Sequence, residues 1–332
     1  MRPDCEIVIP TLGRPSLAVV LDALAGAPYR IVVVDDRPGR SERLVAPGAE
    51  VVPGRAAGPA AARNVGWRST SPSARWVAFV DDDVVPPAGW AEALAADLAA
   101  ADAAGDVGAT QGNIRVPRPD DRRPTDWERN VAGLEDANWA TADMAYRRDV
   151  LEAVGGFDER FPRAYREDAD LALRVQSAGW RLVRGDREIL HPVRPADRWV
   201  SVRLQRGNAD DALMRALHGR GWRERSGAPP GRKARHVAVT AAGAAAIGAA
   251  AARRPSTAFT PRRRALATAA GAAWLAGTAE LAWARISPGP RTRHEVLTMV
   301  LTSAALPPTA TAWSLAGLLR WRRRTARWPL AQ

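Results

Sequence analysis

Residues 76–83 read WVAFVDDD, an unbroken apolar run that ends in three consecutive aspartates. The run predicts a buried β-strand over Trp76–Val80. Side chains alternate along extended backbone, so Asp81 and Asp83 are expected on the same side of the chain, close together. Two such carboxylates repel each other unless a cation lies between them, and oxygen ligands suit Mg²⁺ or Mn²⁺. Aspartate is also a common turn residue and helix cap, which is the alternative explanation.

Similar apolar runs lie nearer the N-terminus. Residues 30–36 read RIVVVDD, which predicts a second strand over Arg30–Val34 that also ends in aspartates. Residues 6–10, EIVIP, predict a further strand. Helical patterns cover residues 15–27, 58–69 and 88–104. This alternation predicts an α/β domain with a mostly parallel sheet flanked by helices, in which ligands bind beyond the carboxyl ends of the strands.

A second acidic segment follows the glycine turn at residues 155–158. Residues 166–175, REDADLALRV, predict a helix with Glu167, Asp168 and Asp170 in its first turn. Acids there complement the helix dipole, so plain helix capping is one explanation for them. Further along, residues 189–192 predict a strand with His191 at its end, and a lone histidine is more often structural than a ligand.

Charge is distributed unevenly along the 332 residues. Residues 1–200 hold 26 basic and 31 acidic residues, whereas residues 201–332 hold 22 basic and only 5 acidic residues. A hydrophobic share of 46% supplies a sizeable core and argues against disorder throughout. The single cysteine, Cys5, excludes an internal disulfide framework and a cysteine-based zinc site. The first residues do not have the pattern of a signal peptide, so the N-terminal domain is expected in the cytoplasm.

The basic C-terminal third is Ala-rich and helical in pattern. Apolar stretches at residues 237–252, 265–284 and 296–319 are flanked by arginines at positions 253–254, 262–264, 291, 293, 320 and 322–324. Membrane spans over 265–284 and 296–319 would violate the positive-inside tendency least. A soluble helical bundle, or an in-plane hairpin bound to anionic lipid, is the alternative. Nucleic acid is not expected as a partner, because no stacking aromatics or helix-turn-helix pattern accompany the charge.

Six motifs in order resemble those of the family 2 glycosyltransferases, which have the GT-A fold and use nucleotide-sugar donors. The resemblance covers roughly residues 5–200. Its motifs are Ile9-Pro10-Thr11, Val33-Val34-Asp35-Asp36, the segment 58–66, Phe79-Val80-Asp81-Asp82-Asp83, Gly155-Gly156-Phe157-Asp158 and Glu167-Asp168-Ala169-Asp170-Leu171. One departure is Arg37-Pro38, which stands where a small polar pair commonly follows the two aspartates and leaves the base and ribose contacts open.

The resemblance implies roles for individual residues. Residues expected to contact the nucleotide-sugar are Thr11, Asp35, Asp36, Arg63, Asp81 and Asp82. The divalent cation, Mn²⁺ or Mg²⁺, is expected on Asp81, Asp83 and His191. Asp168 matches the catalytic base, and Asp143, Met144 and Glu167 are expected on the acceptor side.

These roles imply a metal-dependent transfer with inversion. The cation would meet the charge that develops on the departing diphosphate, while Asp168 removes the proton of the acceptor hydroxyl from the opposite side of the sugar. The acceptor is expected to be a hydroxyl of a cell-envelope glycan, a lipid or a secondary metabolite. The alternatives are a Mg²⁺-dependent nucleotidyltransferase, although Thr11-Leu12-Gly13-Arg14-Pro15 only faintly imitates a phosphate loop, and a catalytically inactive membrane scaffold.

The expected organisation follows from these assignments. A GT-A catalytic domain is predicted over residues 1–222, a linker over 223–236 and an Ala/Arg-rich helical, membrane-associated region over 237–332. The protein is therefore expected at the cytoplasmic face of the cell membrane, with a soluble cytoplasmic protein as the alternative.

Overall fold

The computed structural model describes residues 4–39, 42–251 and 261–322. Contacts divide the chain into two compact units that are both discontinuous in sequence. The first unit comprises residues 1–117, 131–194 and 221–228, and the second comprises residues 118–130, 195–220 and 229–332. The domain boundaries expected from the sequence stay a prediction. The arginines at 253–254 and 323–324, and the first three residues, lie outside the described residues.

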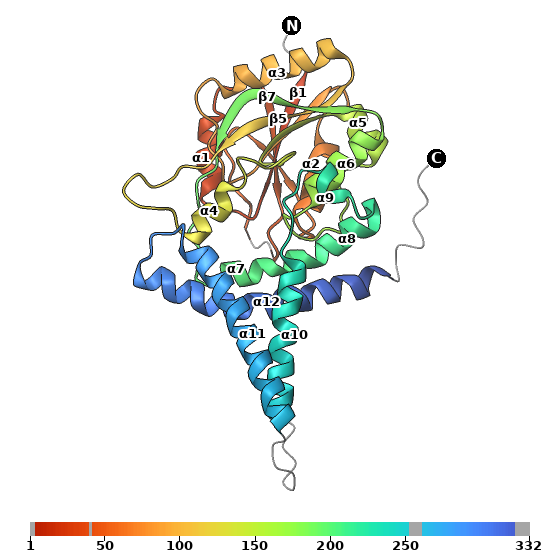
Figure 1. Ribbon diagram of the computed structural model, residues 1–332. Coiled ribbons are helices and arrows are strands. Elements are labelled where there is room, and N and C mark those ends of the chain that lie inside the picture. Colours follow the sequence, from red (N-terminus) through yellow and green to blue (C-terminus); the bar gives the residue numbers. More distant parts are fainter. Residues whose placement is uncertain (1–3, 40–41, 252–260, 323–332) are drawn as a thin grey trace. The chain divides into compact units, whose positions relative to one another are not determined.

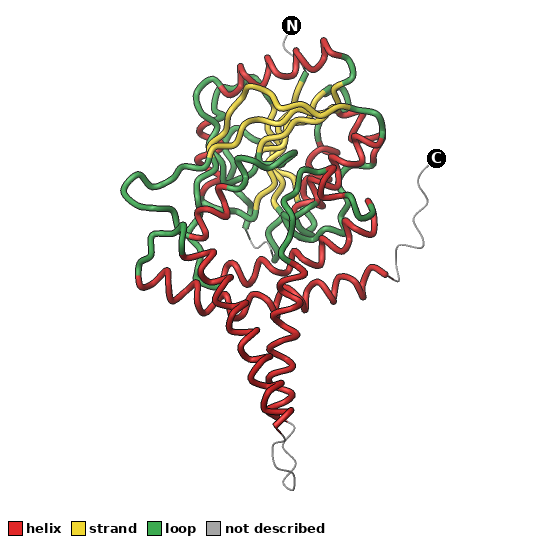
Figure 2. Tube along the Cα trace, viewed as in Figure 1, coloured by secondary structure: helices red, strands yellow, loops and turns green. Residues whose placement is uncertain are grey.

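The first unit is built on a seven-stranded sheet in the order β3-β2-β1-β4-β6-β5-β7, seen at the centre of this unit in Figure 2. The strands are β1 (Cys5–Thr11), β2 (Arg30–Asp35), β3 (Glu50–Pro53), β4 (Trp76–Val80), β5 (Val107–Arg115), β6 (Asp143–Arg147) and β7 (Arg181–Leu190). Every pairing is parallel except those of β6, which runs antiparallel to both β4 and β5. The predicted α/β class with a mostly parallel sheet is confirmed.

Burial explains why these segments form strands. All five residues of β4 are buried, as are residues 31–35 of β2, so both strands are covered on both faces. Continuous apolar runs are the pattern that such strands require. The segments 180–183 and 189–192, which the sequence presents separately, belong largely to the single strand β7, which ends at Leu190 next to His191.

Helices cover both faces of the sheet (Figure 1). In chain order they are α1 (Ser16–Ala23), α2 (Pro59–Ser69), α3 (Trp90–Ala104), α5 (Arg148–Val154), α6 (Glu167–Ser177) and α9 (Trp222–Arg225). Helix α2 begins with proline, whose fixed φ suits the first helical position, after Gly58 at φ 94°. Gly66 lets α2 approach β1 closely, because a Cβ there would lie 2.2 Å from Val8 Cγ1.

The buried core of this unit includes one continuous cluster between the sheet and α2, α5 and α6. Val8, Val34 and Phe79 contribute from the strands, and Trp67 and Leu171 contribute from the helices. The Phe79 ring packs edge-on against Phe157, with ring centroids 5.2 Å apart. This packing fixes the helices that carry the acidic and basic residues discussed below.

The second unit is helical in its described part. Its helices are α7 (Val200–Arg203), the 3₁₀ turn η1 (Leu204–Gly207), α8 (Asn208–His218), α10 (Lys233–Ala251), α11 (Pro261–Ile286) and α12 (Arg293–Arg322), together with most of α4 (Asp126–Ala132). Figure 1 shows α10 and α11 side by side as a hairpin. Helix α12 continues through Pro307 and Pro308 and packs against α8, α10 and α11.

The helix that passes a length and hydropathy test for a membrane span is a different one from the two expected. Among the described helices, α10 alone is long and apolar enough to cross a membrane, as judged by length and composition. The segments expected to span, 265–284 and 296–319, lie in α11 and α12, which do not meet this criterion. Helix α11 carries Glu280 and has three arginines after its first residue, while α12 buries serine and threonine residues. The expected pair of spans stays a prediction.

Candidate active site

The aspartates singled out by the sequence gather at one edge of the sheet. Strand β1 pairs in parallel with β2 on one side and β4 on the other, so their carboxyl ends share an edge. Thr11 ends β1, Asp35 ends β2, and Asp81 follows β4 directly. The edge therefore presents acidic side chains where open α/β sheets bind ligands.

Asp82 is held by residues from the end of β1. Thr11 Oγ1 donates to Asp82 Oδ2 at 2.5 Å, and Arg14 Nη1 lies 2.6 Å from Asp82 Oδ1. The Asp82 side chain is buried, whereas Arg14 is partly exposed. Arg14 was not predicted as a site residue, because nothing in the sequence indicates a pairing across 68 positions.

The two aspartates after β2 have separate partners. Asp35 binds the guanidinium of Arg37 through both oxygens, at 2.8 and 2.9 Å. Asp36 accepts backbone N–H bonds from Ala56 at 2.7 Å and Gly58 at 3.2 Å, and so orders the loop that leads into α2. Arg37, the residue at which the sequence departs from the family pattern, thus forms a bidentate ion pair with Asp35.

A buried arginine links two of the predicted groups. Arg63 lies on α2 with only 2% of its surface exposed. Its Nη2 donates to Asp81 Oδ1 at 2.7 Å, and its Nη1 donates to Glu167 Oε1 at 2.9 Å. Arg63 therefore spans from the acidic edge of the sheet to the N-terminus of α6. The sequence placed Arg63 near the nucleotide but gave no sign of this bridge.

The start of α6 is strained and polar. Arg166, the residue before the helix, has a φ of 77°, in the left-handed region that non-glycine residues rarely adopt. Asp168 accepts the backbone N–H of Ala169 at 2.7 Å and is partly buried. Glu167 is almost fully buried, and its Oε2 has no hydrogen-bond partner among the described residues.

The pKa values of the two acids at the start of α6 are both raised. Burial raises the pKa of Glu167 to about 8, with the charge of Asp168 adding to the shift. Burial also raises the pKa of Asp168, although the Ala169 N–H and Arg63 oppose the change and the charge of Asp81 adds to it. Raised pKa values of neighbouring carboxyl groups are typical of functional sites.

The third aspartate after β4 faces a histidine and an arginine. Asp83 is mostly buried, with Arg194 Nε at 2.9 Å and His191 Nε2 at 3.8 Å. Burial and the charge of Asp81 raise the pKa of Asp83. The Nδ1 atom of His191 is buried and has no hydrogen-bond partner in the part of the chain that the structure describes.

These atoms fit a hard divalent cation. Within the described residues there is no group of three or more metal-ligating side chains in ready-made ligand geometry. Even so, Asp81 and Asp83 are close enough for the charge of one to raise the pKa of the other, and a cation between them would relieve that repulsion. The carboxylate oxygens, with the His191 imidazole beside Asp83, are donors that suit Mg²⁺ or Mn²⁺.

Asp143 and Met144 lie in the core instead of on an acceptor surface. Both side chains are fully buried on β6, and Met144 belongs to the hydrophobic cluster. Asp143 accepts from Trp90 Nε1 at 2.9 Å and from Arg187 Nε at 2.8 Å. Arg187 also binds Asp97, so Asp143 belongs to a buried structural ion network. The structure thus contradicts the acceptor-side role expected for these two residues.

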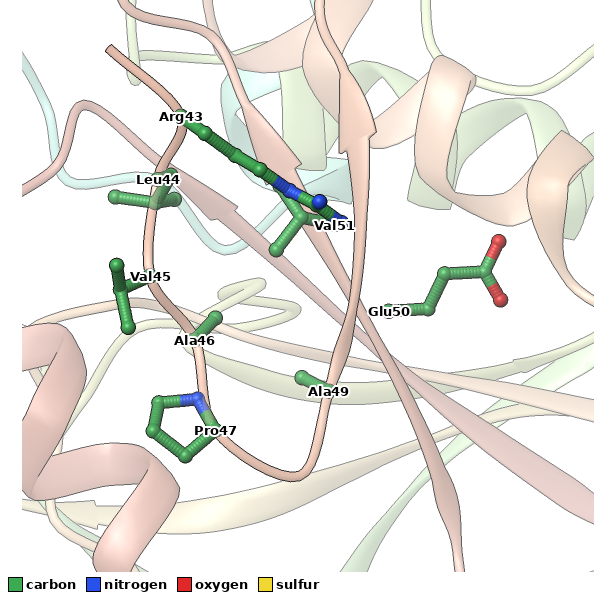
Figure 3. Close-up of a pocket in the computed structure, with 8 residues that line it drawn as sticks. All are labelled: Arg43, Leu44, Val45, Ala46, Pro47, Ala49, Glu50 and Val51. Atoms are coloured by element: carbon green, nitrogen blue, oxygen red, sulfur yellow. The ribbon is translucent and has the colours of Figure 1, made fainter.

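A surface cavity of about 370 Å³ lies apart from the acidic edge. It is lined by residues 43–47 and 49–51, which lead into β3. Figure 3 shows the carboxylate of Glu50 pointing away from the other lining side chains, consistent with its ion pair to Arg30. None of the residues expected to bind the donor lines this cavity.

Comparisons with known proteins agree with the geometry. Residues 6–155 match the model of the glycosyl transferase family 2. The pre-mycofactocin glycosyltransferases of two Mycobacterium tuberculosis strains, CDC 1551 / Oshkosh and ATCC 25618 / H37Rv, are 31% identical over 195 residues, covering 54% of this chain and 40% of theirs. The chain thus spans less than half the length of these curated relatives.

Solved structures resemble the chain only distantly. TarS residues 1–349 of S. aureus are 12% identical with a TM-score of 0.41, covering 94% of this chain and 91% of that one. The glucosyl-3-phosphoglycerate synthase of M. tuberculosis is 18% identical with a TM-score of 0.43, covering 69% and 82%. These scores are too low to carry an argument. The sequence match that carries weight is the one over residues 6–155, which contains the acidic edge and Arg63: this part of the chain matches glycosyl transferase family 2.

Proposed function

We propose that this protein is a metal-dependent, inverting glycosyltransferase that moves a sugar from a nucleoside-diphosphate donor to a hydroxyl acceptor. The observation that carries the proposal is the Arg63 bridge. It joins Asp81, at the edge where the family binds its donor, to Glu167, which precedes Asp168. The proposed metal ligand Asp81 and the residue next to the proposed base Asp168 are thereby tied to the same buried guanidinium.

The donor would lie along the carboxyl ends of β1, β2 and β4. Thr11 and Asp82 form one hydrogen-bonded pair there, and Asp36 orders the loop beside them. Asp36 accepts two backbone N–H bonds, whereas a carboxylate can accept about four. It can therefore accept from the base or ribose of a nucleotide without giving up its present partners.

Asp81 and Asp83, with His191, are the proposed ligands of Mn²⁺ or Mg²⁺. When bound, a divalent cation supplies positive charge against the diphosphate leaving group. Arg63 holds one oxygen of Asp81 at 2.7 Å, and this contact fixes the orientation of the carboxylate. Arg194 and His191 face Asp83 and add positive or polar character at the same position.

Asp168 is the proposed general base. An acceptor hydroxyl is a weak nucleophile until its proton leaves, and a carboxylate within hydrogen-bond reach can accept that proton. The Ala169 N–H fixes one oxygen of Asp168, so the other is available for the acceptor. Because one base would act opposite one leaving group, the reaction is a single displacement with inversion at the anomeric carbon.

Glu167 positions Arg63, and the charge of Arg63 in turn acts on the proposed base Asp168. Its side chain is buried and paired, with 2% of its surface exposed. This position favours an orienting role over direct contact with the acceptor. The acceptor class remains a hydroxyl of a glycan, lipid or secondary metabolite, and the place of action is the cytoplasmic face of the membrane.

The test is the identity of the released product. The full chain is incubated with a panel of nucleoside-diphosphate sugars, with Mn²⁺ and with chelator, and the release of nucleoside diphosphate and of pyrophosphate is measured. We expect metal-dependent release of nucleoside diphosphate. Incubation of nucleoside triphosphates with sugar phosphates covers the alternative, and pyrophosphate release there would indicate a nucleotidyltransferase. Turnover of no donor under any condition would indicate an inactive scaffold.

A further inference from the structure

Helix α12 of the second unit exposes several leucines while it buries several hydroxyl groups. Beside the apolar Met299, Leu306, Ala310 and Trp321, the helix buries four residues with hydroxyl groups, Thr298, Thr302, Ser303 and Ser314. The residues exposed along it include four leucines, Leu297, Leu301, Leu315 and Leu319, each with 50% or more of its surface accessible. Scattered exposed leucines need no explanation, but apolar residues outside and hydroxyl residues inside the same helix do.

The four leucines form one stripe. At about 100° per residue, positions 297, 301, 315 and 319 fall within about 40° of one another around the helix axis. Exposed Pro308 falls in the same sector. From residue 297 to residue 319 the helix rises by 22 steps, or about 33 Å. We call Leu297, Leu301, Leu315 and Leu319 the leucine stripe.

The orientation of α12 is fixed by a polar network on its other face. Arg285 Nη1 donates to Thr302 Oγ1 at 2.8 Å and to Ser303 Oγ at 3.1 Å. Arg285 Nη2 binds Asp126 at 2.8 Å and Ser201 at 3.0 Å. Rotating α12 to bury the leucines would leave these groups without partners, at a cost in desolvated polar atoms. The leucine stripe is therefore held outward by the fold.

Charge is arranged to suit an anionic surface. No charged residue occurs between Glu295 and Arg320 in the sequence, and exposed Arg293 and Arg320 stand at the two ends of the stripe. An apolar face bounded by arginines is typical of a helix that lies in the plane of a membrane interface. Helix α12 does not qualify as a span by hydropathy, which agrees with an in-plane position.

We propose that the leucine stripe is a membrane-docking surface, with α12 lying in the plane of a bilayer that contains anionic lipid. This inference rests on the membrane location proposed above but not on the chemistry of transfer. A second copy of the chain is a poorer occupant. Residues 201–332 hold 22 basic and 5 acidic residues, so two such surfaces would bring like charges together.

The test places an environment-sensitive fluorophore on the stripe of the full-length protein. Leu315→Cys is labelled with a nitrobenzoxadiazole probe. The native Cys5 stays unlabelled, because it is buried and burial raises its thiol pKa to about 12. Val19→Cys, at an exposed apolar position on α1, is the matched control. Each is mixed with vesicles of phosphatidylcholine alone or with phosphatidylglycerol added.

We expect a blue shift and brighter emission at position 315 with phosphatidylglycerol vesicles, a weaker change with phosphatidylcholine, and no change at position 19. Leu301→Glu and Leu315→Glu should each weaken vesicle binding about tenfold or more. Both should keep the rate at which nucleoside diphosphate is released in solution, which separates this inference from the proposed reaction. Unchanged emission with both vesicle types would overturn it. So would a blue shift that appears without vesicles and grows with protein concentration, which would indicate self-association.

Discussion

Arg63 Nη2 lies 2.7 Å from Asp81 Oδ1, and the arginine is 2% exposed while the aspartate side chain is 27% exposed. A fully buried cation thus holds a carboxylate that reaches the surface of the sheet edge. The other end of the same guanidinium holds Glu167. Burial alone would lower the pKa of Arg63, but the negative charges of Asp81 and Glu167 outweigh it and the pKa is raised overall. The guanidinium therefore stays charged. Its positive charge is therefore a permanent feature of the site.

Replacing the proposed base should separate binding from chemistry. Asp168→Asn keeps the size of the side chain but removes proton acceptance, so sugar transfer should fall about 10²- to 10⁴-fold. The affinity for nucleoside diphosphate, measured by calorimetry, should stay within about twofold of wild type. Asp170→Asn, two residues further along the same helix, is the control for local structure. Transfer by Asp168→Asn at the wild-type rate would remove Asp168 from the mechanism.

The pH dependence of activity should report the environment of Asp168. Its raised pKa means that the base gains its proton at a higher pH than an ordinary aspartate, so activity should fall as pH drops through a value above ~3.9. Arg63 lowers this pKa, so Arg63→Gln should move the acidic limb to higher pH. Arg68→Gln, which removes an exposed charge from the same helix, should leave the limb in place. Equal profiles for wild type and Arg63→Gln would contradict the electrostatic role of Arg63.

Removing the proposed metal ligand should abolish the effect of metal on donor binding. Asp83→Asn loses the charge that a divalent cation needs, so Mn²⁺ should strengthen nucleoside-diphosphate binding by wild type but not by the variant. We expect a difference of at least about tenfold, measured by titration with Mn²⁺ and with chelator. The Glu188→Gln variant, an exposed acid of the same unit, is the control. If Mn²⁺ improves binding by Asp83→Asn as much as by wild type, the assigned ligand is wrong.

The buried network around Arg187 should matter for stability and not for acceptor recognition. Arg187→Met leaves Asp97 and Asp143 buried without their cation, which should lower the free energy of unfolding by about 3–5 kcal/mol. Exposed Arg184→Met should change it by less than about 1 kcal/mol. Chemical denaturation measures both. A variant at Arg187 that unfolds like wild type would contradict the structural assignment of this network.

A capping box at the start of α4 offers a pH test of stability in the second unit. Glu128 accepts the backbone N–H of Thr125 at 2.7 Å, and Thr125 Oγ1 lies 3.3 Å from the Glu128 N–H. The contact with Arg122 is the main reason that the pKa of Glu128 is lowered to about 2. A lowered carboxyl pKa stabilises the fold above the unfolded value of about 4.5, and this stability is lost as pH falls towards 2.

Glu128→Gln should therefore be less stable than wild type at pH 7. The gap should shrink as pH falls from 4.5 to 2. Thr125→Ala should cost about 1 kcal/mol across the whole range, because its cap carries no charge. Thermal unfolding measured against pH follows all three proteins, and a gap for Glu128→Gln that is constant with pH would argue against the ion pair.

The extent to which sequence alone predicts this molecule differs between its parts. Strand β4 was predicted with its observed bounds, because a continuous apolar run closed by aspartates has few alternatives. The antiparallel strand β6 between β4 and β5 was not predicted, since strand order and direction depend on pairings far apart in the chain. Asp143 shows the same limit: its partner Arg187 lies 44 positions later, so its place in the core could not be read from the local pattern.

The candidate site was likewise predicted only in part. The acids at the strand ends were predicted, because parallel strands bring their carboxyl ends to one edge. The arginines that pair with these acids were not predicted. Only the structure identifies the partners as Arg14, Arg37 and Arg194. Arginine is so frequent in this chain that no single one stands out by composition.

The most direct test of the account is the anomeric configuration of the sugar released when the protein turns over its donor, followed by proton NMR before the product mutarotates. A base opposite a single leaving group predicts inverted configuration in the first-formed product, from water or from an acceptor hydroxyl. First-formed sugar with the donor's own configuration would contradict the role of Asp168 as the base of a single displacement.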